Sequence, residues 1–124
     1  MNWNITAGRP VYVQLIEQLE LAIVTGDYPL GSRIPPVREL AAEAGVNPNT
    51  MQRALQELET RGLLQTMRTS GRIVSADEQT LHDLRQKRAE ICLSEFLLQM
   101  QKLGYSRQET LDLLQRADFP SENR

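Results

Sequence analysis

The stretch that decides the fold is residues 45–61, Gly-Val-Asn-Pro-Asn-Thr-Met-Gln-Arg-Ala-Leu-Gln-Glu-Leu-Glu-Thr-Arg. Asn47 belongs to the residue types favoured at a helix N-cap, and Pro48 suits the first helical position. Apolar residues then recur at helical spacing and predict one buried stripe, made of Met51, Ala54, Leu55 and Leu58.

The opposite face of this helix carries Asn49, Gln52, Arg53 and Gln56. Amide and guanidinium groups are the ones that read adenine and guanine edges in a DNA major groove. Two interpretations stay open from this helix alone, a recognition helix for DNA and an ordinary surface helix.

The residues before this stretch favour the first interpretation. A helix is expected from Pro10 to the residues before Gly26, and a short helix from Val37 until Gly45 ends it. Two helices joined by a short glycine-containing turn, the second with a polar face, form the helix-turn-helix pattern.

After Arg61 the pattern changes to two strand-like segments, Leu63–Met67 and Arg72–Ser75, which predict a β-hairpin. Three helices followed by a hairpin make a winged helix-turn-helix. Arg68 and Arg72 flank the hairpin tip, where they could reach phosphates or a minor groove. The alternative is that they are solvated hairpin charges.

The C-terminal part predicts a long helix, about Gln79–Leu103, and a shorter one from Ser106 to about Ala117, before a polar tail, Asp118–Arg124. The second half of the long helix is apolar around most of its circumference, and one short helix cannot cover it. We therefore expect a homodimer, with interface residues Leu84, Ile91, Leu93, Phe96, Leu97, Met100, Leu103, Leu111 and Leu114.

The predicted fold class is mainly α with a small β-hairpin. A winged helix-turn-helix DNA-binding domain is expected over residues 1–75, and a two-helix C-terminal dimerisation region over 76–124.

Composition limits the other function classes. Cys92 and His82 are the only cysteine and histidine among 124 residues, so neither a disulfide, a metal site nor a catalytic pair is expected. We expect no enzyme activity and no cofactor, and Cys92 is interpreted as a small buried apolar residue. No apolar run is long enough to span a membrane and no signal pattern opens the chain, so a cytoplasmic location is expected.

The net charge of −2 does not exclude nucleic acid, because its distribution matters more than the sum. The excess acid lies after residue 75, whereas arginines fall in the elements expected to face DNA. Such a local basic face predicts modest non-specific affinity with a strong salt dependence.

Several separated motifs together resemble the GntR family of bacterial transcription regulators, and its YtrA-like subfamily in particular. They are Gly31-Ser-Arg-Ile-Pro-Pro-Val-Arg-Glu-Leu-Ala, Gly45-Val-Asn-Pro-Asn-Thr, Ala54-Leu-Gln-Glu-Leu-Glu and Gly62-Leu-Leu. The resemblance implies DNA contacts from Arg38, Asn47, Asn49, Thr50, Gln52, Arg53, Arg68, Thr69, Ser70, Gly71 and Arg72.

The chain departs from the family pattern at two positions. Pro36 stands where the family usually has a serine N-cap, and Thr69 stands where the hairpin tip usually has a first glycine. The resemblance further implies a repressor, often of transporter operons.

The leading hypothesis is a dimeric repressor that binds double-stranded DNA at a palindromic operator. Any small-molecule effector is expected at a subunit or domain interface, because the tail is too short to enclose a metabolite pocket alone. A winged-helix module that binds proteins and an enzyme are the alternatives from other classes.

Overall fold

A computed structural model describes residues 1–120 of the chain. It contains five helices and one hairpin: α1 (Val11–Val24), α2 (Val37–Ala44), α3 (Pro48–Thr60), β1 (Leu64–Met67), β2 (Gly71–Val74), α4 (Glu78–Lys102) and α5 (Arg107–Arg116). The predicted fold class is confirmed, with helix ends within about two residues of those expected. The last four residues of the predicted polar tail, 121–124, lie outside the described residues.

The described residues divide into two compact units, one ending at Arg85 and the other beginning at Gln86. Helix α4 runs across this division without a break. The predicted domain boundary between residues 75 and 76 stays a prediction.

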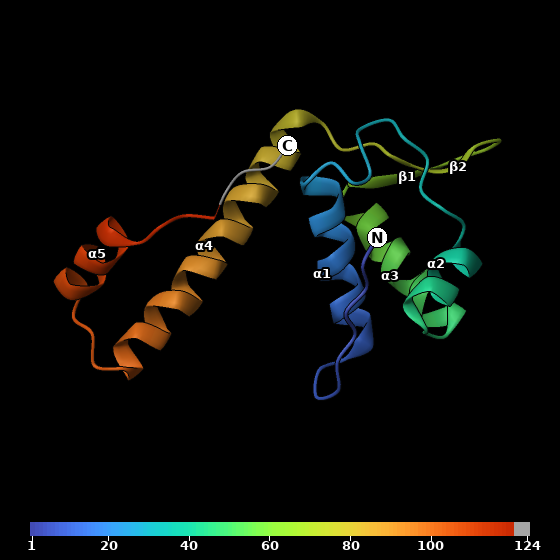
Figure 1. Ribbon diagram of the computed structural model, residues 1–124. Coiled ribbons are helices and arrows are strands. Elements are labelled where there is room, and N and C mark those ends of the chain that lie inside the picture. The colour runs from blue at the N-terminus through green and yellow to red at the C-terminus, as the bar shows by residue number, and fades with distance from the viewer. Residues whose placement is uncertain (121–124) are drawn as a thin grey trace. The chain divides into compact units, whose positions relative to one another are not determined.

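The core of the first unit is built around α3, which packs against α1, α2 and β1 (Figure 1). The predicted stripe of α3 is fully buried, since Met51, Ala54, Leu55 and Leu58 are each 0% exposed. Leu15 and Leu19 of α1 and Leu40 of α2 complete the centre of this core.

A third backbone segment, residues 31–34, pairs with the hairpin. β1 and β2 pair in antiparallel register from Leu64 opposite Val74 to Met67 opposite Gly71. On the other side of β2, Gly31 donates to the Val74 carbonyl at 2.8 Å, and Val74 donates to the Ser32 carbonyl at 2.9 Å. A further backbone bridge joins Arg33 to Ile73. This pairing fixes the segment before α2 against the hairpin.

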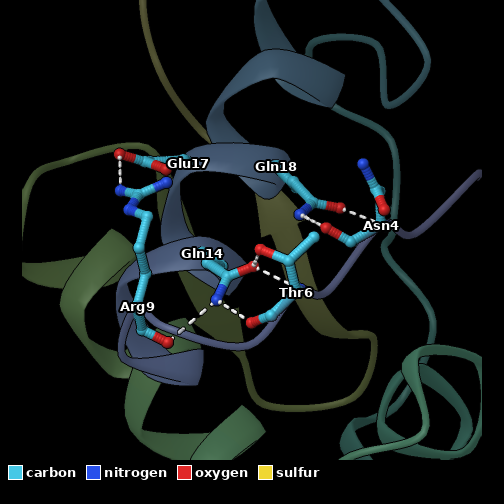
Figure 2. Close-up of polar contacts among 6 residues, drawn as sticks. All are labelled: Asn4, Thr6, Arg9, Gln14, Glu17 and Gln18. Atoms are coloured by element: carbon cyan, nitrogen blue, oxygen red, sulfur yellow. Dashed lines mark hydrogen bonds and ion pairs between the residues drawn. The ribbon is translucent and has the colours of Figure 1, made fainter.

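The N-terminal segment is held along α1 by two glutamine side chains (Figure 2). Gln18 Oε1 accepts from the Asn4 amide at 2.9 Å, and its Nε2 donates to the Asn4 carbonyl at 2.8 Å. Gln14 makes the same pair of contacts with Thr6, both at 2.8 Å. The two side chains therefore bind the backbone N–H and C=O groups of the N-terminal segment, as the backbone of a neighbouring strand would. Trp3 and Ile5 pack against the core.

The second unit contains the rest of α4 and α5. Gly104, with a φ of 90°, ends α4 in a conformation that favours glycine. The predicted capping box opens α5: Glu109 donates its amide to the Ser106 hydroxyl at 3.1 Å, and its carboxylate accepts from the Ser106 amide at 3.0 Å. Met100 and Thr110 are the buried side chains of these two helices.

Candidate nucleic-acid interface

The turn between α2 and α3 is formed by a glycine and a cap. Gly45 ends α2 with a φ of 70°, a left-handed conformation that is strained for most other residues. Asn47 then accepts the Asn49 amide on its Oδ1 at 2.7 Å and so caps α3, with Pro48 in the first turn. The α2–α3 pair therefore has the local geometry of a helix-turn-helix.

The side of α3 opposite the core presents polar groups. Asn49, Arg53 and Gln56 are exposed, while Thr50 and Gln52 are half-buried. Pro48 and Asn47, at the start of the helix, are exposed as well. The surface that α3 offers thus consists of amides, one hydroxyl and one guanidinium, with its carboxylates Glu57 and Glu59 in the second half of the helix.

Three arginines next to this surface have no acidic partner. Arg38 on α2, Arg68 in the hairpin turn and Arg33 in the segment beside β2 are exposed, and their side chains make no ion pair or hydrogen bond with any residue from 1 to 120. Unpaired guanidinium groups are suited to DNA phosphates, which they bind as charged donors.

Arg33 was not among the residues expected from the sequence. It lines a cleft of about 390 Å³ between the start of α2 and the hairpin, together with the two residues that depart from the family pattern, Pro36 and Thr69. Its position depends on the backbone pairing with Ile73, forty residues later in the chain. No local sequence pattern predicts such a pairing.

Two other arginines near the same surface are held by protein groups. The Arg53 guanidinium lies over the Tyr12 ring, 4.0 Å from its centroid. Arg72 Nε donates to Glu59 Oε1 at 2.8 Å and an Arg72 terminal nitrogen to Gln52 Oε1 at 3.5 Å. Arg72 therefore contacts α3 and is not free at the hairpin tip.

Arg61, at the end of α3, ties that helix to α1. It donates to Glu20 at 2.8 Å and to Glu57 at 2.9 Å. Burial by itself would lower the pKa of Arg61, but the hydrogen bonds to Glu57 and Glu20 outweigh it, and the net pKa is raised. This arginine stays charged and serves the packing of the first unit.

The residues expected at a dimer interface lie in several environments. In the second unit most are exposed in the single chain: Ile91, Leu93, Leu97, Leu103, Leu111 and Leu114. Phe96 is half-buried there, Met100 is buried within the unit, and Leu84 packs against the core of the first unit. Cys92 is exposed, so its interpretation as a buried residue was wrong for the single chain. The reason is that α4 offers apolar side chains on several faces and α5 covers only part of them.

Within residues 1–120, no three or more histidine, cysteine or acidic side chains gather in a way that could hold a metal ion. None of the helices in that range combines the length and the apolar character needed to cross a bilayer.

Comparison with known proteins gives consistent matches. Residues 11–74 match the family model for bacterial regulatory proteins of the gntR family. The HTH-type transcriptional regulator YhcF of Bacillus subtilis is 31% identical over 112 residues, which are 90% of this chain and 93% of that protein. The HTH-type transcriptional repressor YtrA of the same organism is 38% identical over 74 residues, 60% of this chain and 57% of YtrA.

Among solved structures, a GntR family transcriptional regulator from Listeria monocytogenes superposes with a TM-score of 0.80 at 31% identity, covering 91% of this chain and 99% of that one. The structure of AraR(DBD) in complex with operator ORE1 has a TM-score of 0.52 at 26% identity, covering 60% of this chain and 94% of that one. YhcF, YtrA and the Listeria protein are named as transcription regulators and not as enzymes.

Proposed function

Because the chain belongs to the gntR family of bacterial regulatory proteins, and is thus a DNA-binding transcriptional regulator, we propose that it acts as a dimeric repressor at a palindromic operator. The repressor activity is supported by the similarity to YtrA, which is named a repressor. The operator would control a transporter-type operon, as the resemblance to the YtrA-like subfamily implies, in the cytoplasm of a bacterium.

The observation that carries the proposal is the exposed polar face of α3 beside unpaired arginines. Asn49 and Gln52 are suited to base edges, and Arg53 to guanine or phosphate. Arg38 and Arg68 are exposed on the neighbouring elements and suited to phosphates. The other proposed contacts are Asn47, Thr50, Thr69, Ser70 and Gly71, to which the position of Arg33 adds a further phosphate contact. Arg72, also expected to contact DNA from the sequence, donates to Glu59 instead.

The proposal of a dimer rests on the second unit. Its leucines and isoleucine are about half exposed in the single chain, including Ile91 at 50% and Leu97 at 42%. Large apolar side chains exposed in this number are typical of a protein–protein interface. A second copy of the chain supplies a matching surface, since a twofold interface pairs the same patch on both subunits. Any small-molecule effector would bind between subunits or between domains.

Two copies would place two α3 helices in successive major grooves, with half-sites roughly one helical turn apart. A single copy presents only a few unpaired arginines beside α3 within residues 1–120, and it would bind weakly. Operator binding is therefore expected to depend on the dimer.

Gel-shift assays on DNA from the region upstream of the protein's own gene test the DNA contacts. Arg38→Ala should abolish retention of the operator fragment while leaving the helical circular dichroism unchanged. Arg107→Ala, which removes an exposed arginine of α5, is the matched control and should bind as the wild type does. Equal binding by both variants would rule out the role of Arg38.

Sedimentation velocity over a range of concentrations tests the dimer. The wild type should sediment as a dimer, and Leu97→Glu, which places a charge in the exposed apolar surface, should sediment as a monomer. A dimer that survives both Leu97→Glu and Leu93→Glu would place the interface elsewhere. Point variants are preferable to a truncation after residue 75, because Ala76 is buried and Leu81 packs against the core of the first unit.

A further inference from the structure

Arg72 occupies a place between the hairpin and the recognition helix that its position in the sequence did not suggest. We propose that Arg72 is a positioning residue, which fixes the Gln52 amide and the hairpin relative to α3, and that its charge is not used to bind a phosphate. The inference rests on the proposed reading of operator bases by Gln52.

The geometry of the contact ties both strands of the hairpin to one carboxylate. Glu59 Oε1 accepts from Arg72 Nε on β2 at 2.8 Å and also from the Thr66 hydroxyl on β1. Gln52 and Glu59 are seven residues apart, which is about two helical turns, so they lie on the same side of α3. Arg72 bridges them from the hairpin side.

The charges explain why Arg72 differs from its neighbour Arg68. Glu59 lies on the same side of α3 as Gln52, where an unpaired carboxylate would repel DNA phosphates. Arg72 neutralises it, and only 16% of the Arg72 side chain and 29% of the Glu59 side chain are exposed. Arg68 is exposed and has no acidic partner among residues 1–120. The pair therefore contributes little net charge to DNA, whereas Arg68 contributes a full one.

The contact also sets what Gln52 can present to a base. Its Oε1 is directed toward an Arg72 terminal nitrogen at 3.5 Å, and its Nε2 makes no hydrogen bond within residues 1–120. The amide N–H groups thus remain available as donors. Acceptors on major-groove edges are guanine N7 and O6, adenine N7 and thymine O4. Every base pair carries such an acceptor, but at a different place in the groove, so we expect the fixed position of the Gln52 amide to decide which one is reached.

The test compares removal of the Arg72–Glu59 pair with Arg68→Met in the whole chain. Affinity is measured across a salt series for two duplexes of equal length, the footprinted operator and an unrelated sequence. Arg68→Met should reduce the slope of log affinity against log salt by about one for both duplexes, as the loss of a phosphate contact does. The double variant Arg72→Met with Glu59→Gln, which removes both charges of the pair and leaves no unpaired carboxylate, should leave this slope and the affinity for the unrelated duplex unchanged, and lower operator affinity by about tenfold, within the range of one base contact.

A double variant shows whether Arg72 acts through Gln52. In a Gln52→Ala background, Arg72→Met should cause less additional loss of operator discrimination than it does alone. Glu59→Gln, which keeps Arg72 but removes the charge that holds it, should lower the ratio of operator to unrelated affinity. A phosphate contact released from Glu59 would instead raise affinity for both duplexes and leave the ratio unchanged.

The inference is overturned if the double variant Arg72→Met with Glu59→Gln reduces the salt slope on both duplexes as Arg68→Met does. It is also overturned if Arg72→Met and Glu59→Gln, both folded by circular dichroism, keep the operator ratio of the wild type. A wild type that does not distinguish the operator from the unrelated duplex would contradict the proposed function itself, which separates the two failures.

Discussion

In the first unit Leu15, Leu40 and Leu55 are 0% exposed, whereas in the second unit Leu93 and Leu98 are 53% and 52% exposed. Both units are rich in leucine, but they differ in how many helices and strands are available to bury it. The first unit closes three helices and a hairpin around one core, while the second has only α4 and α5 to cover its apolar side chains. The comparison indicates that the first unit folds around its own core, and it is the basis of our proposal that the second unit provides a surface for a second copy.

The largest expected effect is a cavity in the first unit. Leu55→Ala should lower the free energy of unfolding by about 2–5 kcal/mol, because Leu55 is fully buried at the centre of the core. Trp3, the only tryptophan, packs against this core and reports its unfolding by fluorescence in urea. The matched change in the second unit, Leu98→Ala, should leave the Trp3 transition unchanged at a fixed monomer concentration. An equal loss from both leucines would show that the two units share one core.

The next effect is expected at the pair that joins α3 to α1. Arg61→Met should destabilise the first unit by about 1–2 kcal/mol, below the range for fully buried pairs because the guanidinium is partly solvated. Most of this loss of stability is expected from Glu20, because its side chain is only 9% exposed and would lose the Arg61 guanidinium. Arg116→Met is the control in the second unit, because Arg116 makes only a local contact with the Asp112 carbonyl at 3.4 Å. Urea unfolding followed by Trp3 fluorescence should distinguish the two.

The helix caps allow a like-for-like comparison between units. Asn47→Ala and Ser106→Ala each remove a side-chain acceptor from a helix start and should each cost about 1 kcal/mol. The first should shift the Trp3 transition and weaken DNA binding. The second should increase hydrogen exchange in α5 and leave the Trp3 transition in place. If Ser106→Ala shifted the Trp3 transition as much as Asn47→Ala, the units would unfold together.

The smallest effect concerns acid. Hydrogen bonds from the Ser106 backbone amide and hydroxyl hold the pKa of Glu109 below its ordinary value. A lowered pKa in the folded state means that the carboxylate stabilises α5 above about pH 4.3, the ordinary glutamate value, and that this stabilisation is lost as the pH falls through the lowered pKa. Protection of the α5 amides, measured relative to their intrinsic exchange rate at each pH, should therefore fall in acid, and Glu109→Gln should abolish this dependence. The side-chain cap of α3, Asn47, is neutral and should show no such trend.

Much of the fold could be predicted from the sequence because its signals are local. Three helix ends are fixed through contacts within about four residues. They are set by Asn47 with Pro48, by Gly45, and by Ser106 with Glu109. The burial stripe of α3 follows from helical spacing alone. These features need no knowledge of distant residues.

The candidate site was less predictable because its side chains are placed by distant partners. Arg33 is positioned by pairing with Ile73, Arg53 by the ring of Tyr12, and Arg72 by Glu59. A sequence pattern shows that an arginine is present near the reading surface. It does not show whether that arginine is already paired with another group of the protein.

The two glutamines that hold the N-terminal segment restrict which residues positions 14 and 18 can accept. Each position needs one acceptor and one donor side by side at the end of the same planar group, and a primary amide offers both in this arrangement. Glutamate lacks the donor at neutral pH, leucine lacks both, and asparagine is one methylene too short. Two glutamines four residues apart on α1 therefore indicate, from the sequence alone, that the N-terminal segment is held along this helix.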